Sequence, residues 1–508
     1  MKLERTKNSL RNAGFGMLYK IISIVMPFMV RTVFIYTLGI EYLGLNSLFT
    51  SILTVLNLTE LGFSSAIVFC MYAPIANNDV DTINALLKFY KKIYTYIGII
   101  ILVVGSLVIP FLPFLVKGEY PVEINIVIVY MIFLVNTVLS YFTYGYLSSI
   151  ITAFQRDDLL SKINIFITTG MYIVQIIILL TVNNYYIYIL VMPVFTIITN
   201  IGTAIIAKKM FPQYIPKGKL EECYKNQIKE KVSGLFIFKL CYVTRNAFDS
   251  IFISMFLGLA STAIYNNYYY IMNAVVGITS VFTTAILSGA GNSVEMETVE
   301  KNYNDMNKMN FIYMWITGWF TTCLLCLYQP FMNIWVGKSM MYPFSCVVLI
   351  CLYFYILKMG DIRYVYEQAK GLWWEYRYRS ILEAIANIVL NFVLGKFFGV
   401  YGIIFATIIT IFVINYFWGA KIIFKEYFVN QKISEYFLQN IIYFIVMVVT
   451  SFITLYCCKF VPYSFVGLGI RGIICLIVPN FLRWIILKHN KRYKEAMPWF
   501  LNKLNIKK

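Results

Sequence analysis

Charged residues are scarce in this chain. Only 13% of its 508 residues are Asp, Glu, Lys or Arg, and 60% are apolar. A typical soluble domain is ~25% charged and ~45–50% apolar. The mean hydropathy is +0.72. This composition excludes an ordinary soluble protein and indicates a membrane protein that crosses the bilayer many times.

Histidine is almost absent, because His489 in the basic C-terminal tail is the only one. Histidine-based catalytic triads and histidine metal sites are therefore excluded. The ten cysteines show no framework of regular pairs. Cys323 and Cys326 form a C-x-x-C inside an apolar run, with no second pair along the chain. We interpret them as packing residues in preference to a metal or redox site.

Acidic residues are fewer than basic ones, 24 against 43, which gives a net charge of +19. A net charge this positive would suit binding to nucleic acid. The basic residues fall between apolar runs and at the termini, however, which is typical of charge that anchors cytoplasmic loops. We therefore expect no nucleic-acid partner. The basic start of the chain lacks a small-residue cleavage site and is interpreted as a cytoplasmic leader into the first helix.

Nucleotide-binding motifs with a supporting context are also missing. Gly467–Gly472 reads GLGIRG and fits G-x-G-x-x-G, but it lies in an apolar helix with no preceding strand. We therefore expect no nucleotide cofactor.

Long apolar runs dominate what is present. A spanning helix needs ~20 mostly apolar residues, and about fourteen segments reach that length. They lie at about 13–38, 43–70, 93–116, 124–150, 160–182, 186–207, 233–257, 262–289, 309–332, 342–367, 379–396, 400–420, 436–458 and 464–487. The predicted fold class is an all-α polytopic membrane protein with about fourteen transmembrane helices.

An internal repeat predicts how these helices are grouped. A shift of 219 positions places Lys20 on Lys239 and Gly39 on Gly258. An even number of spans per half gives both halves the same orientation, so we predict two parallel six-helix repeats plus two C-terminal helices. The predicted parts are an N-terminal half at 1–207, a cytoplasmic linker at 208–231, a C-terminal half at 232–424, and helices 13–14 with a basic tail at 425–508.

The distribution of Lys and Arg predicts the orientation in the membrane. With the N-terminus inside, the predicted outer loops carry only Lys117, Lys338, Lys396 and Lys459, and most other basic residues fall in inner loops and tails. Cytoplasmic loops are the basic ones in membrane proteins. We therefore predict that both termini are cytoplasmic.

The first predicted span contains two basic residues, Lys20 and Arg31. They are eleven positions apart, close to three helical turns, and so share one stripe. A charge near the bilayer centre costs ~2.5–3.5 kcal/mol on insertion scales, so each needs a partner or a cavity. Arg31 either pairs with Glu60 of the second span or binds a substrate anion. Lys20 lies nearer the inner end, where snorkelling to the interface is the alternative to lining a cavity.

Two later spans carry the other intramembrane candidates. Arg245 lies near the middle of the seventh span with Asp249 one turn on, so these two either neutralise each other or leave Arg245 for substrate. Lys239 in the same span either snorkels or lines the cavity entrance. Arg363 and Glu367 lie at the end of the tenth span. Either they form a structural charged helix end, or Arg363 lines the cavity.

Two stretches of the chain carry a family resemblance. The first reads RTVFIYTLGIEYLGLNSLFTSILTVLNLTELGFSSAI and is followed by YAPIANND and FYKK. The second reads EQAKGLWWEYRYRSILEAIANIVLNFVLGKFFGVYGIIFATIIT. They resemble bacterial polysaccharide flippases of the multidrug, oligosaccharidyl-lipid and polysaccharide exporter superfamily, and the second resembles the region of their tenth to twelfth helices. The predicted number and grouping of spans agree with that family.

The resemblance implies a transport function in the plasma membrane. Such proteins move an oligosaccharide linked through diphosphate to undecaprenol from the inner to the outer leaflet by alternating access. The product serves capsule, lipopolysaccharide O-antigen or exopolysaccharide assembly, with membrane lipids and the polysaccharide polymerase machinery as candidate partners and H⁺ or Na⁺ as candidate coupling ion. The predicted substrate-binding residues are Arg31, Arg245, Arg363, Lys20 and Lys239, and the supporting or coupling residues are Glu60 and Asp249.

Two other functions remain as alternatives. A cation-coupled multidrug exporter of the same fold is the runner-up, although such exporters favour acidic cavities and this chain has a surplus of intramembrane basic residues. An enzyme, such as a polysaccharide polymerase or a lipid-linked glycosyltransferase, is disfavoured because the predicted outer loops are short and show no catalytic constellation. We therefore predict that the chain is not an enzyme.

Overall fold

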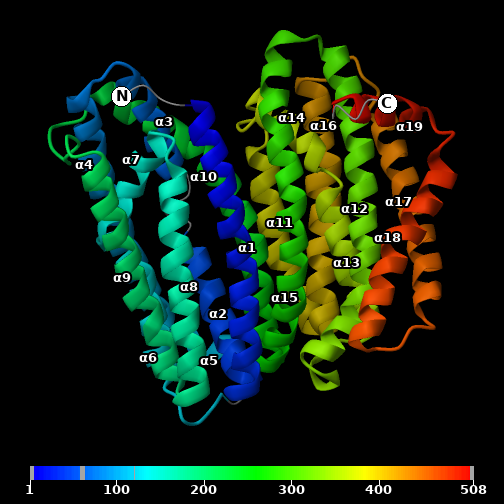
Figure 1. The fold of residues 1–508 in the computed structure, drawn as a ribbon, viewed down its shortest axis with the longest axis horizontal. Helices are drawn as coiled ribbons and strands as arrows, with labels where there is room; N and C mark the ends of the chain where they lie inside the picture. Colours follow the sequence, from blue (N-terminus) through cyan, green and yellow to red (C-terminus); the bar gives the residue numbers. More distant parts are fainter. Residues whose placement is uncertain (1–4, 58–62, 119, 504–508) are drawn as a thin grey trace. The chain divides into compact units, whose positions relative to one another are not determined.

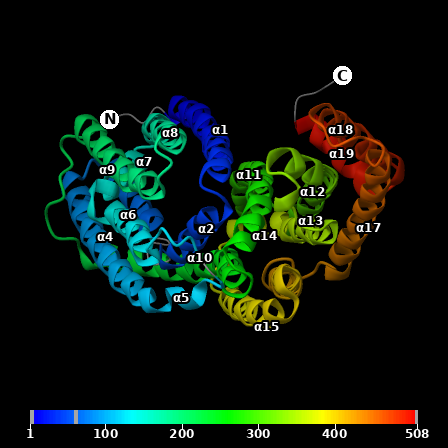
Figure 2. The ribbon, with the colours of Figure 1, turned by 90° about the horizontal axis from the view of Figure 1, so that it is seen from below.

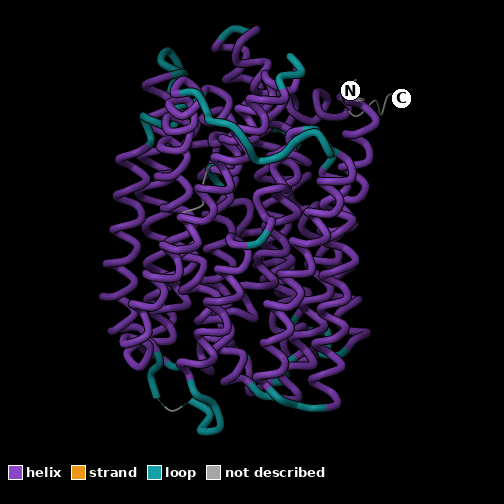
Figure 3. Tube along the Cα trace, turned by 90° about the vertical axis from the view of Figure 1, so that its left-hand side faces the viewer, coloured by secondary structure: helices purple, strands orange, loops and turns teal. Residues whose placement is uncertain are grey.

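The computed structural model describes residues 5–57, 63–118 and 120–503. Helices make up nearly all of the described residues, and no strand occurs among them (Figure 3). Apolar helices of spanning length run through the chain, so it is a multi-pass membrane protein. The all-α polytopic fold predicted from the apolar runs is confirmed.

The chain folds into two compact units, Met1–Ala263 and Ile264–Lys508 (Figure 1). The boundary lies inside α11 (Leu259–Met296). The predicted division at the 208–231 linker rests on the sequence repeat, which is a different criterion, and it stays a prediction. The first unit holds α1 (Arg5–Thr37), α2 (Ile40–Leu56), α3 (Phe63–Ala76), α4 (Val80–Val108), α5 (Leu112–Leu115), α6 (Ile126–Phe142), α7 (Ser148–Ala153), α8 (Asp157–Thr181), α9 (Tyr185–Met210) and α10 (Glu222–Leu257).

The second unit begins in α11 and continues to the C-terminal region. Its further helices are α12 (Val299–Trp335), α13 (Phe344–Lys358), α14 (Asp361–Lys370), α15 (Arg377–Ile409), the π-helix η5 (Thr410–Trp418), α16 (Gly419–Glu426), α17 (Ile433–Cys458), α18 (Phe465–Leu487) and α19 (Lys491–Lys503).

Ten helices among the described residues are long and apolar enough to cross a membrane, or eleven if the bent pair α6 and α7 counts as one span. The remaining predicted spans are helical as well. One of them is divided between α2 and α3, with residues 58–62 outside the described set. Another is α10, whose middle carries charged residues.

The run from α15 to α16 contains two predicted spans in succession. Its 50 residues would extend about 75 Å as one straight helix, far beyond a ~30 Å hydrocarbon layer. Gly399 breaks the helical path with φ 58° and ψ −136°. This break lies between the predicted spans 379–396 and 400–420, as the positions of those apolar runs require.

In the first unit, α1 packs mainly along α8, and α6 packs on both α4 and α9 (Figure 2). An aromatic cluster, defined as Phe34, Tyr42, Tyr185 and Tyr188, joins α1, α2 and α9, and all of its members except Tyr42 are buried. The Phe34 ring meets the Tyr188 ring edge-on at 5.0 Å, and Tyr42 meets Tyr185 at 4.9 Å. Edge-to-face aromatic pairs add stability beyond their buried area.

Two glycines that the repeat aligns have the same backbone conformation. Gly39 precedes α2 with φ 100° and ψ 177°, and Gly258 precedes α11 with φ 86° and ψ 178°. Positive φ is unstrained only for glycine, so each can end one helix and start the next without a loop. Nearby, Gly44 of α2 faces the start of α11, where an added Cβ would lie 2.3 Å from the Leu259 carbonyl oxygen.

In the second unit, α12 is the central helix and packs against α13, α17, α18 and α19 (Figure 2). Its buried face contributes Met306, Phe311 and Met314 to the unit's hydrophobic core. The last two spans also bond to it by polar groups. Thr322 shares a hydrogen bond of 2.7 Å with Ser451 of α17 and accepts one of 3.0 Å from Arg483 of α18. Helices α17 and α18, which lie outside the predicted repeat, are therefore integral to this unit.

Replacing Gly44 by alanine should destabilise the first unit. The new methyl group would overlap the Leu259 carbonyl, and overpacking of this kind costs about 1–3 kcal/mol. We expect Gly44→Ala to lower the apparent melting temperature of the purified protein. Gly16→Ala in α1 is the control, because nothing lies within 4 Å of its added Cβ. Equal melting temperatures for Gly44→Ala and wild type would contradict the close approach.

The predicted orientation can be tested at Cys223, which is exposed near the start of α10. If the 208–231 segment is cytoplasmic, a membrane-impermeant maleimide should label Cys223 only after the cells are opened. A cysteine placed at Lys338, in a predicted outer loop, should be labelled in intact cells. Labelling of Cys223 from outside would reverse the predicted topology.

Candidate functional site

Arg31 lies about four-fifths of the way along α1 and is half-buried. Its Nη2 donates a hydrogen bond of 3.4 Å to the carbonyl of Ala263 in the first turns of α11. The aromatic cluster is less than one turn further along, where Phe34 is buried between Tyr185 and Tyr188. These aromatic contacts hold α1 against α9, and so they fix the position from which the guanidinium group extends.

The other predicted residues of the N-terminal half have different positions. Lys20 is exposed on α1, about three turns from Arg31 toward the N-terminal end. Glu60, the predicted alternative partner of Arg31, lies outside the described residues, so that pairing stays a prediction. Lys239 is within the helical path of α10, but its side chain is outside the described set.

Arg245 and Asp249 lie one turn apart in the C-terminal half of α10. Their side chains are 4% and 1% exposed, and both interact with neighbouring protein groups. Helix α10 packs against α2 and α3 of the first unit, so Arg31 and Arg245 belong to the same compact unit. A buried carboxylate at this spacing offsets the charge of the arginine.

Arg363 is completely enclosed in the second unit. Its Nε lies 2.7 Å from Glu367 Oε1, which confirms the predicted pairing along α14. Its Nη1 donates to the Tyr416 carbonyl at 2.6 Å, and its Nη2 donates to Asn415 Oδ1 at 3.3 Å. Gly419 leaves room for the group, since a Cβ there would lie 2.7 Å from Nη2. Protein groups thus engage the guanidinium on several sides, and a substrate role for Arg363 stays a prediction.

Asn415 joins this ion pair to a second one. Its Nδ2 donates to Glu383 Oε2 at 3.0 Å, and the same oxygen accepts from Arg379 Nη1 at 2.8 Å. The result is a buried chain of polar groups, here named the α14–α15 network. It consists of Glu367, Arg363, Asn415, Glu383 and Arg379. Two cations and two carboxylates make it neutral as a whole.

A signal in the sequence could have revealed half of this network. Arg379, Glu383, Asn387 and Asn391 recur at every fourth position of a predicted span, and all four are buried on one face of α15. Asn387 continues the polar contacts by donating to Thr407 Oγ1 at 3.1 Å. Apolar residues at this spacing are expected in a spanning helix, so a polar stripe indicates a buried network. The stripe carries no net charge, because Arg379 and Glu383 offset each other and the other two residues are amides. It therefore does not stand out as an isolated intramembrane charge does.

Asn415 lies in the π-helix η5, which the sequence did not predict. π-helical turns are rare and are frequent at functional sites. Here the wider turn follows α15 directly and carries both Asn415 and the carbonyl of Tyr416 to Arg363. The irregular turn thus has a local role in holding the buried guanidinium group.

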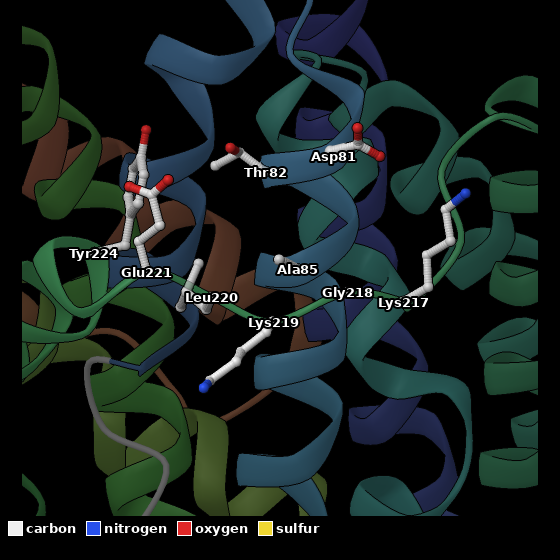
Figure 4. A pocket seen from close by; sticks show the side chains of 9 residues that line it. All are labelled: Asp81, Thr82, Ala85, Lys217, Gly218, Lys219, Leu220, Glu221 and Tyr224. Atoms are coloured by element: carbon white, nitrogen blue, oxygen red, sulfur yellow. The ribbon is translucent and has the colours of Figure 1, made fainter.

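A cavity of about 300 Å³ lies in the first unit beside the start of α4. Figure 4 shows its two walls, which are the first turns of α4 with Asp81 and Thr82, and the segment 217–221. Just before it, Asp79 caps α4 by accepting hydrogen bonds from the Thr82 hydroxyl at 2.6 Å and its backbone N–H at 3.0 Å. These bonds lower the pKa of the Asp79 carboxyl. The cavity contains none of the predicted substrate residues.

The α14–α15 network gives a direct test of the buried charges. Glu367→Gln would leave Arg363 buried without its counter-charge, and breaking such a pair costs about 3–5 kcal/mol. We expect a clear loss of thermal stability. Glu297→Gln is the matched control, because its pair with Lys301 is 2.6 Å long but exposed, and exposed pairs contribute little. Similar losses in both variants would contradict the importance of burial.

Comparison with known proteins identifies the fold. No family model matches this sequence, and no curated protein sequence matches it significantly. The lipid II flippase MurJ in an inward closed conformation is similar with a TM-score of 0.64 and 15% identity, over 94% of this chain and 98% of that one. An inward-facing multidrug resistance MATE family transporter of the MOP superfamily gives 0.62 and 14%, over 80% of this chain and 97% of that one.

A third solved structure supports the same assignment. It is a mutant of the Vibrio cholerae MATE transporter VcmN, with a TM-score of 0.57 and 13% identity, over 85% of this chain and 100% of that one. Sequence identities this low establish the fold alone. The chain therefore has the all-α fold shared by MATE transporters of the MOP superfamily and the lipid II flippase MurJ.

Proposed function

We propose that this protein flips an undecaprenyl-diphosphate-linked oligosaccharide from the inner to the outer leaflet of the plasma membrane. Alternating access would carry the substrate across, and the product would serve capsule, O-antigen or exopolysaccharide assembly. In this proposal both termini are cytoplasmic, and an H⁺ or Na⁺ gradient or the membrane potential supplies the energy.

The extent of the structural likeness supports a lipid-linked substrate. The MurJ structure covers 94% of this chain, against 80% for the MATE structure. Helices α17, α18 and α19 occupy residues 433–503, about a seventh of the chain. The difference between the two covered shares corresponds to about as many residues as this C-terminal segment contains. MurJ is described as a lipid flippase, and the proposal extends that type of activity to this chain.

The observation that carries the proposal is the presence of Arg31 and Arg245 within membrane helices of one unit. Arginine presents two parallel N–H groups, which suit the oxygens of a phosphate. Arg31 is only half-buried, and one of its contacts, the 3.4 Å bond to the Ala263 carbonyl, is long for a hydrogen bond. In this proposal a diphosphate oxygen takes the place of that weak acceptor. Asp249, beside Arg245, would then be the supporting or coupling group.

A cation-coupled multidrug exporter is the second candidate, because MATE transporters share the fold. If this chain were such an exporter, its buried carboxylates would have to attract the cationic drug. In the described part of the chain, Glu367 and Glu383 are each paired with an arginine, at 2.7 and 2.8 Å, and Asp249 has Arg245 one turn away. Their negative charge is offset locally, which favours the anionic substrate.

The proposal predicts that Arg31→Ala and Arg245→Ala weaken binding of a synthetic undecaprenyl-diphosphate oligosaccharide to the purified protein in lipid nanodiscs. A hydrogen bond to a charged group contributes about 1.5–3 kcal/mol, so each loss should be roughly tenfold to a hundredfold. Arg31→Lys should lose less, because it keeps the charge without the planar fork. Arg377→Ala is the control, since Arg377 stacks on Trp374 at 3.9 Å and lies outside the predicted site.

Folding must be checked in parallel by thermal stability. Unchanged affinity in well-folded Arg31→Ala and Arg245→Ala would show that these arginines do not bind the diphosphate. Absence of binding in wild type, with saturable binding of organic cations, would favour the multidrug exporter.

A further inference from the structure

Cysteines from three helices of the second unit meet at one point. Cys326 of α12, Cys458 at the end of α17 and Cys475 of α18 have sulfur atoms within 4.8 Å of one another. They form a small buried core of their own, and Cys323, one turn before Cys326, packs against it. We name these four residues the thiol cluster. Among the described residues, its three buried members are the one group with the spacing of metal ligands.

The geometry of the cluster is that of convergent ligands. Cys326, Cys458 and Cys475 are 1%, 0% and 1% exposed, and all are free thiols. A tetrahedral ion with metal–sulfur bonds of ~2.3 Å holds its sulfurs ~3.8 Å apart. Sulfurs within 4.8 Å can reach that arrangement by small side-chain rotations. Ordinary packing of small side chains does not require thiols from three separate helices to point at one centre.

Two buried arginines flank the cluster on α18. Arg471 and Arg483 are 4% and 2% exposed and lie four residues before and eight residues after Cys475, on the same helical face. Arg471 donates to the Val461 carbonyl and lies 4.8 Å from the centroid of the Tyr463 ring.

Arg483 donates to the Trp315 carbonyl and the Thr322 hydroxyl, each at 3.0 Å. These partners are neutral, like those of Arg471, and no carboxylate pairs with either arginine in the described part of the chain. Buried cations in membrane helices pair with acidic side chains or with backbone carbonyls. A carbonyl leaves the positive charge uncompensated, so an anionic group beside these arginines would be stabilising.

We propose that the thiol cluster binds a soft metal ion as thiolates, Zn²⁺ with all four sulfurs or Cu⁺ with the three buried ones. Each thiol that becomes a ligand releases one proton to solvent, and a metal–sulfur bond replaces the S–H bond. A Zn²⁺ ion with four thiolates, or Cu⁺ with three, carries a net charge of about −2. That charge balances the two arginines beside the cluster.

The proposed ion would have a structural consequence in this unit. It would bind α12, the central helix, to both α17 and α18 at one point. This role is independent of the proposed transport function, since the cluster shares no residue with the predicted substrate site.

The test is the metal content of the purified full-length protein. The protein, kept reduced, is incubated with Zn²⁺ alone or Cu⁺ alone, freed of excess ion, and measured by elemental mass spectrometry. We expect about one ion per chain in wild type and a loss of at least tenfold in occupancy in Cys475→Ser. Cys351→Ser is the matched control, because Cys351 is equally buried but lies in α13 outside the cluster. Comparison of the protein's affinities for the two ions shows whether the site prefers Zn²⁺ or Cu⁺.

A second measurement on wild type avoids dependence on a variant that misfolds. Cys323 and Cys457 are both partly exposed, but only Cys323 belongs to the cluster. Bound Zn²⁺, which uses all four sulfurs, should slow alkylation of Cys323 and leave that of Cys457 unchanged. Equal metal content in wild type and Cys475→Ser would overturn the proposal. So would a reduced protein that takes up no ion, or an isolated protein whose mass shows a disulfide within the cluster.

Discussion

The low polarity of the bilayer is the constraint on which the rest of this structure depends. A charged side chain cannot remain alone in that environment, so each one needs a counter-charge, a route to water or a ligand. The α14–α15 network satisfies this condition with two arginines, two carboxylates and a bridging amide. The arginines of α18 donate to neutral groups. At this place we propose that a bound metal thiolate supplies the negative charge.

The regular features of the fold were predictable from sequence because they depend on local pattern. Apolar runs predicted the spanning helices, and the aligned Gly39 and Gly258 have matching backbone angles at the ends of two helices. The pairing of Arg363 with Glu367 was predictable for the same reason, since both belong to one helix. The number of spans was harder to predict, because one predicted span includes residues 58–62, outside the described set, and two others join across Gly399.

The candidate sites were harder to predict because their members come from different helices. Asn415 is far along the chain from Arg363, and only the π-helical turn places its amide beside both buried ion pairs. The C-x-x-C at Cys323 and Cys326 had no second pair along the sequence, yet folding adds Cys458 and Cys475 from two other helices. The spacing of residues along the sequence predicts which side chains are neighbours within one helix. Contacts between helices depend on packing angles, which that spacing does not determine.

Movement of the lipid-linked substrate between leaflets is the most direct test of the proposed function. The purified protein would be reconstituted in vesicles containing a fluorescent undecaprenyl-diphosphate oligosaccharide, and the fraction accessible to an external quencher would be followed after imposing an ion gradient or a membrane potential. The account predicts redistribution between leaflets that requires the protein and is reduced in Arg31→Ala. If wild type leaves the lipid in place under every gradient but transports organic cations, the flippase account is wrong.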